Sequence, residues 1–169
     1  YKAVRFGEHM AQFDVDYKVP RLTHEPLHAI LQLEQLLNDD TVLLGSSLGG
    51  FYATYLSQRY SIPAVVINPA VRPFELLDNY LGPNYNPYQD THYELDTRHM
   101  DALRRLYLSQ LDTPSLIYLL QQTGDEVLPF QQAVNYYSQC KQHVEFGGDH
   151  SFIGFEQTFA SIVDFLKIT

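Results

Sequence analysis

The sequence predicts an α/β fold with a mostly parallel central sheet and helices on both faces. Two observations support this prediction. Short apolar segments without polar alternation recur along the chain, as expected for parallel strands covered on both sides. Helical patterns separate these segments, which is typical of strand–helix–strand units. We find no internal repeat and no dividing linker in the sequence, so we expect one domain over residues 1–169.

The first third of the chain alternates helical and extended patterns. Residues 1–13 have helical spacing of apolar side chains, and residues 14–20 alternate polar and apolar side chains, which predicts a short strand ending at a proline. Residues 23–37 predict a helix with a broad leucine-rich face. Residues 41–44 predict a short buried strand, and residues 51–60 predict the helix that follows it.

The later elements continue the pattern, with one interruption. Continuous apolar runs at residues 63–70, 116–120 and 143–146 predict three more parallel strands, and residues 155–166 predict a final helix. Between about residues 71 and 113 the alternation breaks, and the segment 79–91 is rich in Pro, Tyr, Asn and Gly. Short helical stretches at 73–78 and 98–109 flank that segment. We expect an insertion or cap over the carboxyl ends of the strands, where α/β sheets bind ligands.

Charge and composition exclude several classes of function. Eleven Lys and Arg against 20 Asp and Glu give a net charge of -9, which argues against binding to nucleic acid or to an anionic membrane surface. No apolar run approaches the ~20 residues that span a bilayer. The single cysteine, Cys140, excludes an internal disulfide and a cysteine-rich metal site, and we interpret it as a filler near a helix end. A cytoplasmic location agrees with this cysteine usage.

The strongest motif is Gly-Ser-Ser-Leu-Gly at residues 45–49, a G-x-S-x-G sequence between a predicted strand and a predicted helix. In this context a tight turn exposes Ser47 at its apex, and the amide of Leu48 points to where an oxyanion would form. The alternative is a glycine-rich turn that only packs closely. A phosphate-binding loop is a weaker competitor because no lysine follows the glycines.

A serine nucleophile needs a base and an acid that orients the base. Of the seven histidines, His150 is the candidate because it lies on a glycine turn just after the last strand. Asp125 occupies a similar glycine turn after the strand at 116–120, with Glu126 as the nearest substitute. Taken singly, each has a simpler interpretation, a surface histidine and a turn aspartate. Together they give the chain order Ser47, Asp125, His150, the order expected for α/β-hydrolases.

Four segments carry a resemblance to a known family: residues 45–54 (GSSLGGFYAT), 68–77 (NPAVRPFELL), 122–128 (QTGDEVL) and 147–152 (GGDHSF). The chain resembles the small bacterial YqiA/YcfP-type esterases of the α/β-hydrolase superfamily from about Asp14 onward. The resemblance implies carboxylesterase or acyl-thioesterase activity, no metal and a cytoplasmic location. It also implies Ser47 as nucleophile, Asp125 as acid and His150 as base.

One departure from the family pattern concerns the N-terminal side. That pattern opens with a strand and a His-Gly-Phe loop ahead of the helix that begins here near Tyr1. The strand lies within the sheet, between the strands predicted at 14–20 and 41–44, and its loop supplies the second oxyanion amide. A sheet without a central strand leaves buried backbone groups unpaired. We therefore expect the working protein to contain residues ahead of Tyr1.

The sequence thus predicts a serine hydrolase that acts on a small-molecule ester or thioester without a cofactor. The insertion would shape the acyl pocket. Arg72 and Phe74 are the candidate substrate contacts: Arg72 would meet an acidic or phosphorylated leaving group, with a surface or core-edge salt bridge as the alternative. A second hypothesis comes from another class, an α/β-hydrolase scaffold used as a non-catalytic binding or interaction module.

Overall fold

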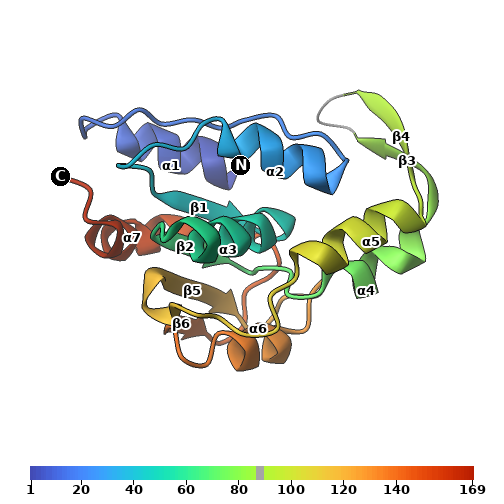
Figure 1. Cartoon of the computed structure of the whole chain (residues 1–169). Coiled ribbons are helices and arrows are strands. Elements are labelled where there is room, and N and C mark those ends of the chain that lie inside the picture. Colours follow the sequence, from blue (N-terminus) through green and yellow to red (C-terminus); the bar gives the residue numbers. More distant parts are fainter. Residues whose placement is uncertain (87–89) are drawn as a thin grey trace.

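The computed structural model describes residues 1–86 and 90–169 and contains a four-stranded parallel sheet (Figure 1). The strand order is β1-β2-β5-β6, and every neighbouring pair is parallel. The strands are β1 Leu43–Ser46, β2 Ala64–Ile67, β5 Ile117–Gln122 and β6 Lys141–Glu145. The predicted mostly parallel sheet is therefore confirmed.

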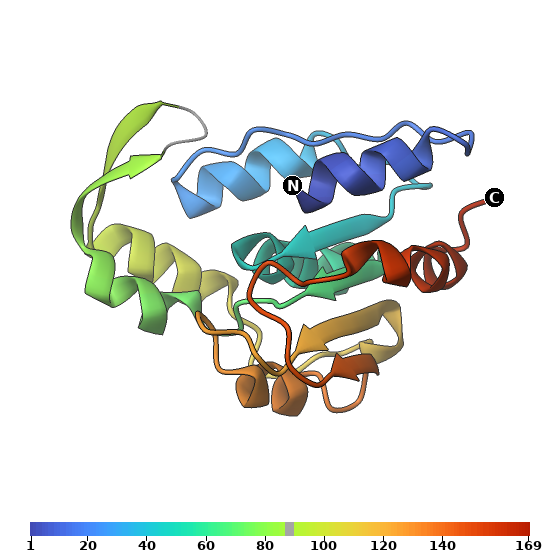
Figure 2. The same cartoon turned by 180° about the vertical axis from the view of Figure 1, so that it is seen from behind.

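Helices cover both faces of this sheet. Alternate side chains of a strand point to opposite faces, and the central strands carry apolar side chains on both, so both faces must be covered. Val65 and Ile67 of β2 pack in one core with α1 and α7, whereas Ala64 and Val66 pack in another with α3 and α6. The helices around the sheet are α1 Lys2–Met10, α2 Pro26–Glu34, α3 Leu48–Tyr60, α6 Phe130–Tyr136 and α7 Phe159–Leu166, with the short 3-10 helices η2 Pro114–Leu116 and η3 Phe155–Thr158. Figure 2 shows α1 and α2 along the β1 edge of the sheet, as Figure 1 does from the other side.

The strand predicted over residues 14–20 is wrong. The segment is extended, but it pairs with no strand of the described residues. It packs on a helix instead: the Tyr17 ring lies against Gly7, and its hydroxyl donates a hydrogen bond to the Ala3 carbonyl at 2.8 Å. The polar–apolar alternation therefore marks an extended segment here, but one without the backbone hydrogen bonds to a neighbouring strand that define a strand.

Residues 73–106 form a separate structural layer beyond one end of the sheet (Figure 1). It consists of α4 Pro73–Leu77, η1 Asp78–Tyr80, the antiparallel strands β3 Gly82–Asn86 and β4 Thr91–Leu95, and α5 Thr97–Leu106. The two strands were not predicted, since the sequence around them has polar, proline-containing turn composition. Part of the segment predicted as irregular, residues 87–89, lies outside the described residues. No described helix is long and apolar enough to cross a membrane.

Candidate active site

Ser47 lies at the junction of β1 and α3 with a strained backbone. Its φ of 53° and ψ of -123° are unusual for a residue other than glycine. Two hydrogen bonds hold this conformation, one from the Ser47 amide to the Ile67 carbonyl at 3.1 Å and one from the Ala70 amide to the Ser47 carbonyl at 3.0 Å. A side chain on Gly45 would collide with the backbone of Gly49, which explains why the tight turn needs a glycine there.

His150 lies in the loop after β6 and reaches back to Ser47. The loop turns through Gly147 and Gly148, which have φ values of 81° and 74°. These left-handed conformations favour glycine, and a side chain on Gly148 would also collide with Gln122. The result is a distance of 3.2 Å between His150 Nε2 and Ser47 Oγ, within hydrogen-bonding range.

Asp125 contacts the other side of the His150 ring. Both carboxylate oxygens lie 2.9 Å from His150 Nδ1, and the Asp125 side chain is fully buried. Its Oδ1 also accepts hydrogen bonds from the Val127 and Leu128 amides at 2.9 Å each. Asp125 therefore both caps the following turn and holds the imidazole. The structure brings the three side chains singled out in the sequence into one continuous chain of contacts.

Two buried amides that the sequence analysis missed fix the loop carrying His150. Asn68, at the end of β2, donates to the carbonyls of Asp149 and His150 at 2.9 and 3.2 Å and accepts from the Gln122 backbone amide at 2.9 Å. The Gln122 side chain accepts from the Asp149 and Ile153 amides and donates to the Ile153 carbonyl. Polar residues that end otherwise apolar strands were the available signal for both.

Two charged groups contact the backbone of the same loop. Glu126 accepts a hydrogen bond from the His150 amide at 2.9 Å, and this bond lowers the pKa of Glu126 below its ordinary value. Glu126 thus binds the backbone of His150, whereas Asp125 holds its ring. Lys2 of α1 donates to the Ser151 carbonyl at 3.0 Å, and partial burial lowers the pKa of Lys2. Both contacts tie neighbouring segments to the His150 loop.

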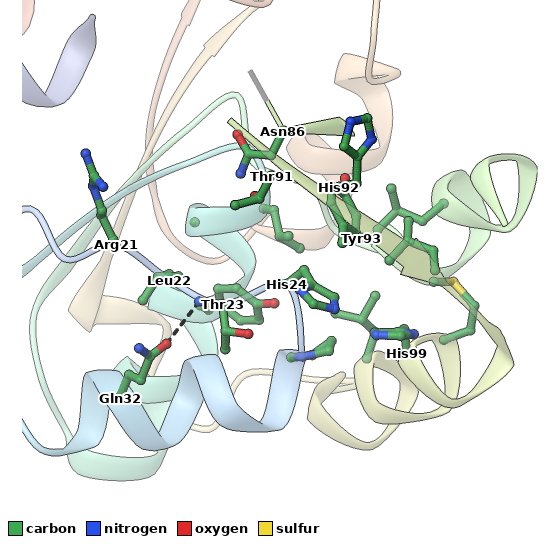
Figure 3. Close-up of a pocket in the computed structure, with 18 residues that line it drawn as sticks. Arg21, Leu22, Thr23, His24, Gln32, Asn86, Thr91, His92, Tyr93 and His99 are labelled. Carbon is green, nitrogen blue, oxygen red and sulfur yellow. Dashed lines mark hydrogen bonds between the residues drawn. The ribbon is translucent and has the colours of Figure 1, made fainter. Parts of the chain in front are cut away.

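A cavity of about 690 Å³ opens beside the start of α3. Leu48, Gly49 and Tyr52 line one wall, close in sequence to Ser47. The layer of residues 73–106 and the segment 21–26 at the start of α2 supply the other walls. His24 and Tyr93 both line the cavity (Figure 3), and their rings pack against each other with centroids 5.0 Å apart. The cavity wall is mixed, with leucine and methionine side chains beside imidazoles and hydroxyls.

Arg72 and Phe74 make contacts within the protein and do not line this cavity. The Arg72 guanidinium pairs with Glu75 at 3.3 Å, and its carbon lies 5.8 Å from the centre of the Tyr107 ring. Phe74 packs edge-on against Tyr107 with 5.6 Å between ring centroids. The salt-bridge alternative for Arg72 therefore has a partner, and substrate contact by either residue stays a prediction.

The fold is similar to that of several solved hydrolases, an esterase domain and a lipase among them. A monoacylglycerol lipase from Paleococcus ferrophilus has a TM-score of 0.68 and 15% identity, covering 96% of this chain and 88% of that one. Alpha/beta hydrolase domain-containing protein 10 from mouse has a TM-score of 0.66 and 17% identity, with coverages of 98% and 83%. The esterase domain of a Rhodothermus marinus protein has a TM-score of 0.60 and 15% identity, with coverages of 98% and 78%. The protein therefore has an α/β-hydrolase fold.

Within this fold, the chain belongs to the uncharacterised protein family UPF0227, whose model matches residues 3–167. This is the YqiA/YcfP family, so the resemblance drawn from the sequence motifs is confirmed.

Proposed function

We propose that this protein is a serine hydrolase that cleaves carboxylic esters or acyl thioesters through an acyl-enzyme. One observation carries the proposal: Ser47 Oγ lies 3.2 Å from His150 Nε2, while His150 Nδ1 lies 2.9 Å from the Asp125 carboxylate. This arrangement matches the nucleophile, base and orienting acid that acyl transfer requires. The strained backbone of Ser47 supports the same role, since it is the conformation of a nucleophile on a strand-to-helix turn.

In the first half of the reaction, Ser47 Oγ attacks the acyl carbonyl carbon while His150 Nε2 removes the hydroxyl proton. The carbonyl π electrons move onto oxygen and form a tetrahedral oxyanion. When this intermediate collapses, the bond to the leaving oxygen or sulfur breaks, and His150 returns its proton to the departing alcohol or thiol. The acyl group remains as an ester of Ser47.

In the second half, water replaces the leaving group. His150 removes a proton from the water, the hydroxide oxygen attacks the acyl carbon, and the bond to Ser47 Oγ breaks with the proton returned to the serine. The products are a carboxylic acid and the free enzyme. Asp125 keeps the Nδ1 proton of the ring in place, so that Nε2 presents its lone pair to Ser47, and it stabilises the imidazolium that forms.

We assign the Leu48 amide as one donor to the oxyanion. Leu48 is the first residue of α3, and the first four amides of a helix have no acceptor within that helix. The positive end of the helix dipole acts at the same place. Loss of one such donor reduces kcat by roughly 10²–10³ in serine hydrolases.

The substrate class follows from the cavity beside Leu48 and from the fold. A cavity of about 690 Å³ with leucine and methionine side chains in its mixed wall can hold a small-molecule acyl group. The neighbours described as an esterase domain and a monoacylglycerol lipase support esters as the first class to test. The cytoplasmic location remains a prediction that rests on the single cysteine and the family resemblance.

The test is hydrolysis of p-nitrophenyl esters and acyl-CoA thioesters of graded chain length by wild type, Ser47→Ala and His150→Ala. We expect saturable hydrolysis by wild type and a loss of at least about 10³-fold in kcat for either variant. Ser46→Ala is the matched control, because Ser46 is the neighbouring hydroxyl. Folded wild-type protein that hydrolyses none of the series, or a Ser47→Ala variant that retains activity, would contradict the proposal and favour a non-catalytic binding module.

A further inference from the structure

A second cluster of chemically active side chains lies where the insertion meets the start of α2. His24 and Glu25 immediately precede α2, and His99 lies in the first turn of α5. One ligand atom from each of these three side chains lies within 4.8 Å of the other two. None of the three takes part in the contacts between Ser47 and His150.

His99 is a buried histidine with one ring nitrogen that lacks a hydrogen-bond partner among the described residues. Its side chain is 3% exposed, and its Nε2 has no hydrogen-bond partner within residues 1–86 and 90–169. The nearest charged atom is Glu25 Oε1, 3.1 Å from Nε2. Since this distance is short enough for a hydrogen bond, the carboxylate must lie away from the direction in which the ring N–H would donate.

The other ring nitrogen of His99 is held by Asp96. Nδ1 lies 3.0 Å from Asp96 Oδ1 and 3.0 Å from the Asp96 backbone nitrogen. If Nδ1 carries the proton and donates to the carboxylate, Nε2 presents a lone pair next to the Glu25 carboxylate. If Nδ1 instead accepts from the backbone amide, Nε2 carries a buried proton without an aligned acceptor. In the first arrangement the Nε2 lone pair and the negative Glu25 oxygen repel each other. A cation bound to both atoms removes this repulsion.

We propose that His24, Glu25 and His99 form a binding site for a divalent cation of the Zn²⁺ type. Two imidazoles and one carboxylate, with water in the fourth position, are a ligand set that zinc accepts. Ligand atoms of tetrahedral zinc lie about 3.3 Å apart for bonds of about 2.0–2.1 Å. The Glu25 oxygen lies 3.1 Å from His99 Nε2 and 3.8 Å from His24 Nε2. Coordination therefore requires a shift of the partly exposed His24 side chain, whose ring packs against Tyr93 and His99.

The surroundings of the three ligands favour zinc over harder cations. Metal-bound imidazoles commonly donate their second N–H to a carboxylate, and Asp96 Oδ1 lies 3.0 Å from His99 Nδ1. In that form the Asp96 backbone amide gives up the hydrogen bond that it donates to Nδ1 in the structure. Mg²⁺ and Ca²⁺ prefer sites made of oxygen atoms, so two imidazoles select against them.

A cation here would join two parts of the molecule. Glu25 and His24 belong to the start of α2, whereas His99 belongs to α5 of the insertion, so coordination would tie the insertion to the helix layer at the sheet edge. Both imidazoles also line the cavity that reaches Leu48, as Figure 3 shows for His24 and His99. The proposal does not depend on the hydrolase function, and the two can fail separately.

The test measures Zn²⁺ binding to the full chain by calorimetry, and Co²⁺ binding by visible absorption, after dialysis against chelator. We expect one Zn²⁺ per chain, Co²⁺ bands typical of a four-coordinate site, no binding of Mg²⁺, and a Zn²⁺-dependent rise in Tm. His24→Ala and Glu25→Gln should each weaken Zn²⁺ binding by more than the ~10–100-fold that loss of an outer-shell partner gives. These variants leave the buried His99 in place, and thermal unfolding of each variant without metal checks that it folds.

His28→Ala is the matched control, because His28 is an exposed histidine one turn further along the same segment and lies outside the cluster. It should bind Zn²⁺ as wild type does. Wild-type protein that takes up no stoichiometric Zn²⁺ would overturn the proposal and leave His99 as an ion-pair partner of Glu25 and Asp96. Binding that His24→Ala and Glu25→Gln do not weaken would also overturn it, because the ion would then lie elsewhere.

Discussion

Replacing Asp125 with asparagine tests how the His150 ring is held. In the structure Asp125 Oδ1 accepts the Val127 and Leu128 amides, and these two donors would keep the carbonyl oxygen of an asparagine in the same place. The amide nitrogen of D125N would then occupy the position of Oδ2, 2.9 Å from His150 Nδ1, and would donate to it. A donor facing Nδ1 favours the ring form that carries its proton on Nε2, which faces Ser47, over the form in which Nδ1 donates to the remaining Oδ1.

The expected loss is large because this tautomer cannot accept the Ser47 proton. The same exchange in a serine protease triad lowers kcat by roughly 10⁴, which corresponds to about 5 kcal/mol of transition-state stabilisation. Folding should change little, since both backbone donors keep their acceptor, and we expect Tm within about 5 °C of wild type. The assay is kcat for the best ester of the graded series, with thermal unfolding of the same preparation.

Asp149 provides the comparison, because it is the acidic residue next to His150 in sequence. Its carboxylate accepts the Ser151 hydroxyl and, within the described part of the chain, makes no hydrogen bond with the imidazole, so Asp149→Asn should lose less than about tenfold in kcat. If D125N retains activity, or if Asp149→Asn loses as much as D125N, the assignment of Asp125 as the orienting acid is refuted.

Three further predictions concern the loop that carries His150 and the single cysteine. Asn68→Ala leaves a buried backbone amide and two carbonyls without their partner. We therefore expect a loss of about 2 kcal/mol or more in the free energy of unfolding and at least about a tenfold loss in kcat. A variant with wild-type stability and activity would contradict this positioning role. The pKa of Glu126 is lowered in the folded state by the His150 amide, so its contribution to stability is present above its ordinary pKa of 4.5 and is lost as pH falls through the lowered value. Urea unfolding of wild type and Glu126→Gln should therefore differ at pH 6 and converge toward pH 3, and a constant difference would argue against that hydrogen bond. Burial raises the pKa of Cys140 to about 11, so iodoacetamide should alkylate it slowly at pH 8 in the folded protein and rapidly after unfolding. Rapid alkylation in both states would contradict the partial burial of this thiol.

The sheet could be predicted from the sequence because its central strands are apolar on both faces. Residues 63–70 and 116–120 carry a pattern that only burial from two sides explains, and β2 and β5 lie there with every residue buried. The hairpin of β3 and β4 was missed because its strands are short, polar and largely exposed. The extended segment 14–20 carries the alternation of a strand but packs on α1, a tertiary preference that local sequence does not reveal.

The candidate site also contains residues that the sequence could predict and residues that it could not. Ser47, Asp125 and His150 were singled out because each follows the carboxyl end of a predicted strand, and parallel strands bring those ends to one edge. Asn68 and Gln122 stand out locally as polar residues that end apolar strands. Their hydrogen-bond partners are backbone groups distant in sequence, which no local pattern identifies. The cluster around His99 was missed for a similar reason, because it joins side chains from the start of α2 and from α5.

Active-site labelling tests the central claim most directly. A fluorophosphonate probe reacts with a serine hydroxyl that a neighbouring base activates, and peptide mapping locates the modified residue. We predict one label per chain on the peptide containing Ser47, lost in Ser47→Ala and His150→Ala and retained in Ser46→Ala. Folded protein that stays unlabelled, or a label that persists in Ser47→Ala, would contradict the proposed nucleophile.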